Sequence, residues 1–280
     1  MSSYSSFAVI GAGTVGGPIL AALAAQPSAK VILLSRSASK SVPANVQVVQ
    51  VPSYDDVPAV TAALKAHKVD VIVSALTTEA IAAQAPLVDA AKQAGVKLFA
   101  PSEFGTSTAG YTEGPFGEKN KIIEKLQSVG VPYLRIFNGL FIEFVTWAVN
   151  YSAETKKLYV IGKSEGTVSA TSIGDVAGYL AHVLTHQPPS VLENQILRIE
   201  GDRIPGYRSL GSLFGAQVET VEKLDGEMAD FKAFLMSIAD QGLATTGHGV
   251  KGVSDEEASK SGNALWPGHQ WKTVKDVFGL

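Results

Sequence analysis

A glycine pattern at the start of the chain constrains its fold more than any other feature. The pattern GxGxxG begins at Gly11, directly after the apolar run 7–10 and before an alanine-rich stretch with helical periodicity. In a strand-turn-helix unit, these glycines permit a tight turn, backbone approach to a pyrophosphate and close packing of helix on strand. The pattern therefore predicts a dinucleotide-binding turn rather than a plain turn. Its expected cofactor contacts are Gly11, Gly13, Thr14, Val15 and Gly16.

Short β-branched runs alternate with helical stretches through the first half of the chain. Strands are expected at 7–10, 30–34, 46–51, 69–73, 97–100 and 133–137, and helices at 15–25, 56–67, 79–94 and 116–129. This alternation predicts an α/β fold with a Rossmann doubly wound sheet of six parallel strands. We expect an NAD(P)-binding domain over residues 1–150 and a smaller C-terminal substrate-binding lobe over 151–280. The two would pack as one body and be partly interleaved.

The residues that follow the second expected strand indicate which dinucleotide is bound. About twenty residues after the glycine turn, an NAD site needs an acidic residue to hold the ribose hydroxyls. The chain has Ser35, Arg36 and Ser37 there, and no Asp or Glu occurs before Asp55. Arg36 and Lys40 can pair with a 2′-phosphate. The sequence therefore predicts NADPH as the cofactor; the alternative is that Arg36 is an ordinary solvated surface charge.

Further cofactor contacts are expected where the other strands end, because ligands of parallel sheets bind beyond the carboxyl ends of the strands. These expected contacts are Ser74, Ala75, Leu76, Pro101, Ser102, Glu103, Phe104, Phe137, Asn138 and Gly139. Lys119, from the helix that follows the fifth strand, is also expected to contact the cofactor.

A lysine near the start of the expected helix 116–129 is a candidate for proton transfer. At about 100° per residue, Lys119 lies about 30° from the centre of the apolar stripe, whereas Lys121 lies about 130° away. Partial burial of an inward lysine lowers its pKa toward the range useful in acid/base chemistry. The alternative is that its stem lies on apolar surface while the ammonium reaches water. Position 115 is proline, so the tyrosine of the usual tyrosine-lysine pair of short-chain dehydrogenases is absent.

Aromatic residues recur at helical spacing after the last expected strand. Phe141, Phe144, Trp147 and Tyr151 are three or four residues apart, which predicts one face of a helix. Such a face is either core or an aromatic wall for a planar substrate. The substrate contacts that we expect are Phe104, Phe141, Phe144 and Trp147. The five histidines show no metal-ligand spacing, and no metal site is predicted.

Charge and cysteine content narrow the class of partner. A net charge of −3 and a pI near 6.0 provide no broad attraction for nucleic acid or anionic membranes, which leaves a small-molecule substrate. The chain has no cysteine, which fits a cytoplasmic location. Residues 244–262 are rich in glycine, serine, threonine and charge and are expected to form a long loop or lid. We expect a monomer or a homodimer.

Several segments together resemble the isoflavone reductase-like and NmrA-like branch of the atypical short-chain dehydrogenases. They are the glycine turn, Arg36, the sequence AAKQAGVKLFAPSEFG at 90–105, the helix with Lys119, GVPYLRIFNGLF at 130–141, TSIGDVA at 171–177 and the tail 264–274. The glycine turn reads GAGTVG where many members have a GATG-type form. The C-terminal lobe is also shorter and the most divergent part.

The resemblance implies a function and a proton donor. In the reductases of this family the first lysine of the helix is the proposed general acid/base, which corresponds to Lys119. The backbone after PSEFG and after Asn138-Gly139 would lie near the nicotinamide. The implied activity is NADPH-dependent hydride transfer to a small, aromatic or conjugated substrate. A non-catalytic NAD(P)-sensing regulator of the NmrA type is the alternative, and an epimerase or quinone reductase would share the same motifs.

Overall fold

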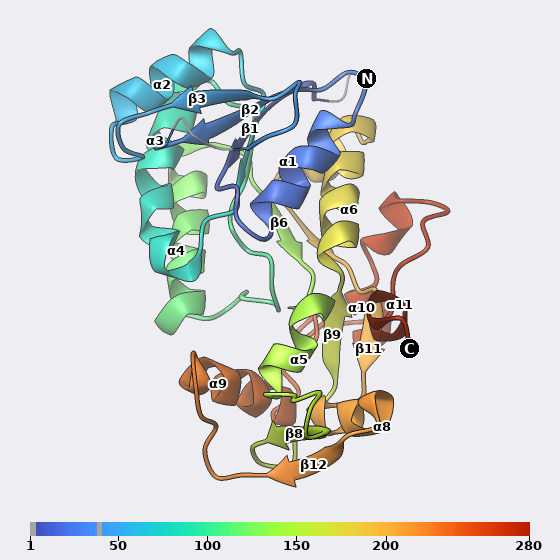
Figure 1. Cartoon of the computed structure of the whole chain (residues 1–280). Helices are drawn as coiled ribbons and strands as arrows, with labels where there is room; N and C mark the ends of the chain where they lie inside the picture. The colour runs from blue at the N-terminus through green and yellow to red at the C-terminus, as the bar shows by residue number, and fades with distance from the viewer. Residues whose placement is uncertain (1–3, 38–40) are drawn as a thin grey trace. The chain divides into compact units, whose positions relative to one another are not determined.

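The computed structural model describes residues 4–37 and 41–280 (Figure 1). The chain divides into two compact units, each built from separate stretches of sequence. The N-terminal unit comprises Met1–Glu103, Thr108–Ile136 and Val176–Leu197, and the C-terminal unit comprises Phe104–Ser107, Phe137–Asp175 and Arg198–Leu280. The expected domains 1–150 and 151–280 stay a prediction. None of the described helices is both long and apolar enough to cross a membrane.

A five-stranded parallel sheet with the order β3-β2-β1-β4-β5 forms the centre of the N-terminal unit. Its strands are β1 (Ser6–Ile10), β2 (Lys30–Ser35), β3 (Gln47–Gln50), β4 (Val71–Ser74) and β5 (Leu98–Ala100). The chain reverses its direction of winding beside β1, which lies between β2 and β4. This is the topological switch point at which doubly wound sheets bind ligands. The predicted fold class is confirmed.

The sixth expected strand is attached differently from the other five. Strand β6 (Leu134–Phe137) pairs with β10 (Gln195–Arg198) in a separate two-stranded sheet. A single parallel bridge between Phe99 and Tyr133 links it to β5. The sequence predicted one sheet of six parallel strands. The structure instead has a sheet of five strands, to which the segment of β6 is joined by a single bridge.

Apolar helix faces cover the sheet of the N-terminal unit. Helices α2 (Val57–Ala66), α3 (Gln84–Ala94) and α4 (Gly114–Val129) pack in sequence on one face, and α1 (Gly16–Ala24) lies on the other (Figure 1). A 3-10 helix, η1 (Thr78–Ala83), precedes α3. Helices α3 and α4 each end at a glycine with a left-handed backbone, Gly95 (φ 73°) and Gly130 (φ 67°). Residues with a side chain adopt this backbone conformation less readily.

Three strands form the main sheet of the C-terminal unit. Strand β9 (Val168–Thr171) pairs in parallel with β7 (Leu140–Phe141) and antiparallel with β11 (Asp202–Ile204). Strands β8 (Lys157–Val160) and β12 (Gln217–Thr220) form a parallel pair. The helical elements of this unit are η2 (Ile142–Phe144), α5 (Val145–Ala148), η3 (Tyr207–Ser209), α8 (Leu210–Phe214), α9 (Ala229–Asp240), α10 (Asp255–Ser259), η4 (Asn263–Leu265) and α11 (Val274–Phe278). Most of α6 (Ile173–His186) and all of α7 (Pro189–Leu192) belong to the N-terminal unit.

Two expectations about the second half were wrong in detail. The aromatic run does not form one helix, because Phe141 belongs to β7, Phe144 to η2 and Trp147 to the four-residue helix α5. Asn150 has a left-handed backbone (φ 46°), which stops the helix before Tyr151. The segment 244–262 is not a plain loop, since it contains α10, which begins with a capping box of Ser254 and Glu257.

Candidate functional site

The glycine turn of the N-terminal unit has three glycines with different physical demands. Gly11 has a φ of 91°, and a Cβ there would lie 2.6 Å from the carbonyl oxygen of Ala75. A Cβ at Gly16 would lie 1.9 Å from the carbonyl oxygen of Gly11. A Cβ at Gly13 would meet no atom within 4 Å. Packing of the protein itself therefore requires glycine at the first and third positions, whereas the second faces open space that a ligand can approach.

The start of α1 is suited to an anion. Val15 precedes the helix without a side-chain hydrogen bond, and the first turn carries no acidic residue. The first backbone N–H groups of a helix have no partner within the helix, and its dipole is positive at this end. Thr14 and Gly13 are exposed beside them. A phosphate would therefore meet unneutralised positive charge at this turn.

Three predicted segments come together at the strand ends next to this turn. The backbone N–H of Ala75 donates to the carbonyl of Ile10 (2.8 Å), and the hydroxyl of Ser102 donates to the carbonyl of Leu76 (2.6 Å). The backbone N–H of Ser102 donates to the side chain of Gln84 (2.9 Å). The ends of β1, β4 and β5 are thereby held as one edge. Ser74 is buried there, and its hydroxyl oxygen has no hydrogen-bond partner among the described residues.

Arg36 follows β2, as the sequence indicated, and lies on an aromatic ring that the sequence did not reveal. Its guanidinium is 5.4 Å from the ring centre of Tyr54. Arg36 is exposed, and no carboxylate pairs with it within residues 4–37 and 41–280. Burial raises the pKa of Tyr54, and Arg36 acts against that rise. Tyr54 lies 18 positions along the chain, so no local spacing could have linked the two. Lys40 lies outside the described residues.

Lys119 of α4 turns inward, as the helical spacing indicated. The residue is half-buried, and its ammonium donates a hydrogen bond to the backbone carbonyl of Glu103, just after β5. Burial lowers the pKa of Lys119 below the ordinary value of 10.5, the Glu103 carboxylate acts in the opposite direction, and the Arg135 guanidinium lowers it further. In contrast, Lys121 is exposed and pairs with Glu118 at 2.6 Å. Lys119 therefore has a desolvated ammonium beside the strand ends.

The side chain of Glu103 belongs to a buried polar network. Its carboxylate accepts hydrogen bonds from Arg135 Nε (2.7 Å) and Thr108 Oγ1 (2.9 Å). Arg135 Nη2 donates to Thr108 Oγ1 (2.6 Å) and to Asn120 Oδ1 (2.8 Å). Glu103 is 2% exposed and Arg135 5%. Glu103 can therefore contact a ligand through its backbone, whereas its carboxylate is committed to Arg135. The arginine within the apolar strand YLRIF is the sequence signal that could have indicated this network.

The predicted residues of the C-terminal unit form a second tight arrangement. The N–H groups of Asn138 and Gly139 both donate to the carbonyl of Gly105, at 3.0 Å each. A Cβ at Gly139 (φ 69°) would lie 2.0 Å from the carbonyl oxygen of Ser169, so this position requires glycine. Phe137 is buried and Phe104 has a φ of 29°, which is unusual for a phenylalanine. The side-chain oxygen Oδ1 of Asn138 is buried without a partner among the described residues.

The expected substrate aromatics lie together in the C-terminal unit. The ring centres of Phe141 and Phe144 are 5.9 Å apart, and those of Phe144 and Trp147 are 6.2 Å apart. Tyr151, which the sequence placed on the same face, instead stacks on Phe214 at 5.2 Å. Phe231 of α9, which the sequence analysis missed, follows Trp147 at 6.5 Å.

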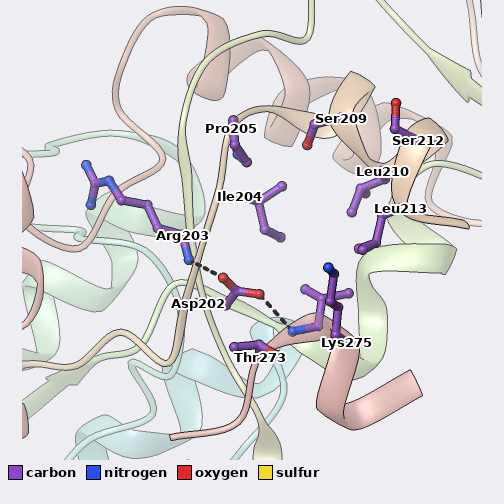
Figure 2. Close-up of a pocket in the computed structure, with 11 residues that line it drawn as sticks. Asp202, Arg203, Ile204, Pro205, Ser209, Leu210, Ser212, Leu213, Thr273 and Lys275 are labelled. Atoms are coloured by element: carbon purple, nitrogen blue, oxygen red, sulfur yellow. Dashed lines mark hydrogen bonds between the residues drawn. The ribbon is translucent and has the colours of Figure 1, made fainter. Parts of the chain in front are cut away.

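A cavity of about 490 Å³ in the C-terminal unit contains none of the predicted site residues (Figure 2). Its walls come from β11, α8 and the start of α11, with Ile204, Leu210 and Leu213 among them. The carboxylate of Asp202 accepts hydrogen bonds from the backbone N–H groups of Arg203 and Val274, at 2.8 Å each. Both oxygens of Asp202 are thus occupied by the protein. The side chains of Arg203 and Lys275 also line this largely apolar cavity.

Comparison with known proteins gives the family. The profile of the NmrA-like family matches residues 4–275, nearly the whole chain. The chain belongs to the NmrA-like family. In this family member, no group of three or more His, Cys, Asp or Glu residues suited to a metal occurs in the part of the chain that the structure describes.

Several relatives of this NmrA-like chain are named as reductases or oxidoreductases. Oxidoreductase aprR of Aspergillus flavus is 35% identical over 145 residues, which are 48% of each chain. Isoflavone reductase homolog IRL of Zea mays is 33% identical over 141 residues, 47% of this chain and 45% of the relative. The match thus spans about half the length of these relatives.

Solved structures share the fold over nearly the whole length. The complex of AtPrR2 with NADP+ and (+)pinoresinol has a TM-score of 0.76 at 21% identity and covers 99% of this chain and 98% of its own. The ternary complex of leucoanthocyanidin reductase from Vitis vinifera has a TM-score of 0.78 at 20% identity, with 98% of both chains covered. These similarities establish the Rossmann-type fold of the NmrA-like chain.

Proposed function

We propose that this chain is an NADPH-dependent reductase that transfers a hydride to a small aromatic or conjugated substrate. The observation that carries the proposal is the inward ammonium of Lys119 at the end of β5, in the same unit as the glycine turn. A regulator that only senses the dinucleotide has no need of a desolvated proton donor there. The names of the relatives, all oxidoreductases or reductases, also favour an enzyme over a regulator.

The residues of the N-terminal unit fit NADPH. The open space at Gly13 and the uncapped start of α1 suit a pyrophosphate, with Thr14 and Val15 beside it. Arg36 lies on the ring of Tyr54 and pairs with no carboxylate among the described residues. Its guanidinium is therefore suited to binding the 2′-phosphate. When bound, the nicotinamide supplies the hydride.

Other cofactor contacts are assigned by their position at the strand ends. Within the N-terminal unit they are Ser74, Ala75, Leu76, Pro101, Ser102 and the backbone of Glu103. From the C-terminal unit we assign Phe104, Phe137, Asn138 and Gly139. Of these groups, the hydroxyl of Ser74 and the amide oxygen of Asn138 are buried and unpartnered, so both could accept a hydrogen bond from a ligand.

Lys119 holds the proton that the reduced substrate requires. Hydride addition to a carbonyl or conjugated carbon leaves negative charge on an oxygen, and a nearby ammonium can neutralise it by donating a proton. Burial has already lowered the pKa of Lys119, which makes proton release from Nζ easier. The carbonyl of Glu103 orients that ammonium, and bulk water restores its proton after the reaction. Phe141, Phe144 and Trp147, with Phe104, are the proposed contacts of the substrate ring.

The decisive experiment compares two lysines of one helix. Purified protein is first tested with NADPH against a panel of aromatic carbonyls and quinones, and turnover is followed by the loss of NADPH absorbance. Lys119→Ala should lower kcat by about 10²–10⁴-fold, because general acid catalysis contributes that much. The exposed Lys121→Ala variant should lose almost nothing, and both should keep NADPH affinity within about threefold of wild type, since neither is assigned to the phosphates.

The contrary outcomes are also informative. Equal kcat values in the two lysine variants would refute the proton-donor assignment. NADPH binding without turnover of any compound in the panel would favour the sensor. We also infer that the protein is located in the cytoplasm, because its sequence contains no cysteine. Its partner is inferred to be a small molecule.

A further inference from the structure

Hydrogen bonds to neighbouring segments fix the backbone of the turn that follows β2. The backbone N–H of Val51 donates to the carbonyl of Ser35 at 2.9 Å, and that of Ser37 donates to the hydroxyl oxygen of Ser35 at 3.1 Å. The side-chain amide of Gln50 donates to the carbonyl of Arg36 at 3.2 Å. The side chain of Arg36, in contrast, is exposed, and an arginine side chain has a large rotamer entropy. The position of its guanidinium therefore depends on what the side chain contacts.

The ring of Tyr54 provides that contact. The guanidinium carbon of Arg36 lies over this ring, 5.4 Å from its centre, and a cation within about 6 Å of an aromatic face is attracted to it. Tyr54 is itself well anchored, because it is 8% exposed and packs in the apolar core of the N-terminal unit. Its hydroxyl donates a hydrogen bond to the carbonyl of Leu34 at 3.4 Å. The ring is thus attached to the end of the same strand that carries the arginine.

The two acidic residues that follow Tyr54 do not neutralise Arg36. Oδ2 of Asp55 accepts a hydrogen bond from the hydroxyl of Ser53 at 3.4 Å. Oδ1 of Asp56 accepts one from a backbone N–H in the first turn of α2 at 3.0 Å, which caps that helix. In the described part of the chain, neither these nor any other carboxylates form an ion pair with Arg36. The guanidinium therefore presents an uncompensated charge, and stacking on a ring leaves its N–H edge available for a phosphate.

We propose that Tyr54 is a specificity-determining residue of the cofactor site, because its ring holds the guanidinium of Arg36 in place for the 2′-phosphate of NADPH. The inference rests on the proposed use of NADPH and adds a positioning residue that acts through the arginine. Without the ring, binding would have to order a mobile side chain, which costs conformational entropy. NADH has no 2′-phosphate, so the ring contributes nothing to its affinity. Tyr54 therefore increases the difference in affinity between the two cofactors.

The test measures the affinities of the full-length protein for NADPH and NADH by calorimetry and compares their ratio between variants. Tyr54→Leu removes the ring and should weaken NADPH binding by about two- to fivefold, the value of a cation–π contact at an exposed site, while NADH binding stays unchanged. Tyr54→Phe keeps the ring and should keep the wild-type ratio. Tyr54→Met fills more of the space without a ring and should lower the ratio as Tyr54→Leu does, so it replaces that variant if Tyr54→Leu does not fold.

Two controls separate positioning of the arginine from general damage to the fold. Tyr133→Leu removes a half-buried tyrosine that packs against the same apolar core, but its hydroxyl contacts Gln127 of α4 rather than the turn after β2. This variant should keep the wild-type ratio. In an Arg36→Ala background, Tyr54→Leu should lower the ratio no further, because the ring acts only through the guanidinium. Adenosine 2′,5′-bisphosphate, which lacks the nicotinamide, should show the same dependence on the Tyr54 ring as NADPH.

Each result has one meaning for the proposal. An unchanged ratio in the ring-free variants, or equal weakening of both cofactors, would overturn it. A further fall in the ratio in the Arg36→Ala background would also overturn it, since the ring would then act on the cofactor without the arginine. Equal affinities of the wild-type protein for NADPH and NADH would refute the cofactor assignment and the proposal together. A preference for NADPH that depends on Tyr54, without turnover of any substrate, would refute the reductase function and support the role of Tyr54.

Discussion

Replacing Glu103 by alanine removes the carboxylate that pairs with Arg135 in a buried ion pair. In the wild-type protein, Glu103 Oε1 accepts from Arg135 Nε at 2.7 Å, and Thr108 Oγ1 donates to Oε2 at 2.9 Å. Both charged side chains are almost completely shielded from water, at 2% and 5% exposure. The variant would leave the guanidinium buried without this carboxylate, while Thr108 Oγ1 and Asn120 Oδ1 still accept hydrogen bonds from Arg135 Nη2.

The magnitude follows from the cost of an uncompensated buried charge. Removing one partner of a buried ion pair costs about 3–5 kcal/mol. For a chain of this size, a change of 1 kcal/mol corresponds to about 2 °C in Tm, so we expect Tm to fall by about 6–10 °C. Glu103→Gln should lose less, because the amide keeps an acceptor for Arg135. Glu118→Ala, at the exposed Lys121 pair, should change stability by at most about 0.5 kcal/mol.

Thermal and urea unfolding followed by circular dichroism would provide these values. A second readout links the network to the proposed chemistry. The Glu103 carboxylate raises the pKa of Lys119, so Glu103→Gln should lower that pKa further and shift the basic limb of the kcat profile to lower pH. The reasoning is refuted if Glu103→Ala unfolds at the same temperature as Glu118→Ala, which would mean that water or a rearranged side chain compensates Arg135.

Three further predictions concern the cofactor turn and acid stability. NADPH should bind at least about tenfold more tightly than NADH, because a guanidinium paired with the 2′-phosphate contributes about 1.5–3 kcal/mol, and Arg36→Ala should abolish that preference in calorimetric titrations. The control variant Lys30→Ala, at the other end of β2, should have no effect. An unchanged preference in Arg36→Ala would contradict the assignment. Gly13→Val should fold normally by circular dichroism, since no atom lies within 4 Å of its Cβ position, yet lose NADPH binding; normal binding would place the pyrophosphate elsewhere. Partial burial of Asp240 raises its pKa, but hydrogen bonds from the backbone N–H groups of residues 163–166 outweigh this and lower the pKa below the ordinary value of 3.8. The ionised Asp240 therefore stabilises the folded state above pH 3.8, and this stabilisation is lost as the pH falls below that value. Asp240→Asn should therefore show a weaker acid-dependent loss of stability in urea titrations between neutral and acidic pH, and an identical pH dependence would exclude this role.

Local patterns predicted the parts of the protein that depend on neighbours in sequence. The turn at Gly11 is specified within six residues, and the inward direction of Lys119 follows from the helical repeat of its own helix. The parallel sheet was predictable for the same reason, since strand and helix periodicities alternate along the chain. The exception was the strand before Phe137, whose pairing with β10 depends on a segment about 60 residues later.

The aromatic run illustrates why periodicity alone is insufficient. The spacing of Phe141, Phe144 and Trp147 fits a helix, yet their rings meet from three different elements. Pairing of β7 with β9 competes with helix formation at Phe141, and the left-handed Asn150 ends the helix before Tyr151. Tertiary contacts thus overrode a local preference that is worth only fractions of a kcal/mol per residue.

By itself, the sequence determined the glycine turn, the basic residue after β2 and the inward lysine, because each depends on backbone geometry within one strand-helix unit. Only the tertiary structure decided that Glu103 pairs with Arg135, that Tyr54 lies under Arg36 and that the ring of Phe231 lies beside that of Trp147. These contacts join residues 18 to 84 positions apart, and their geometry follows from how strands pair and helices pack. No periodicity within a single element encodes that arrangement.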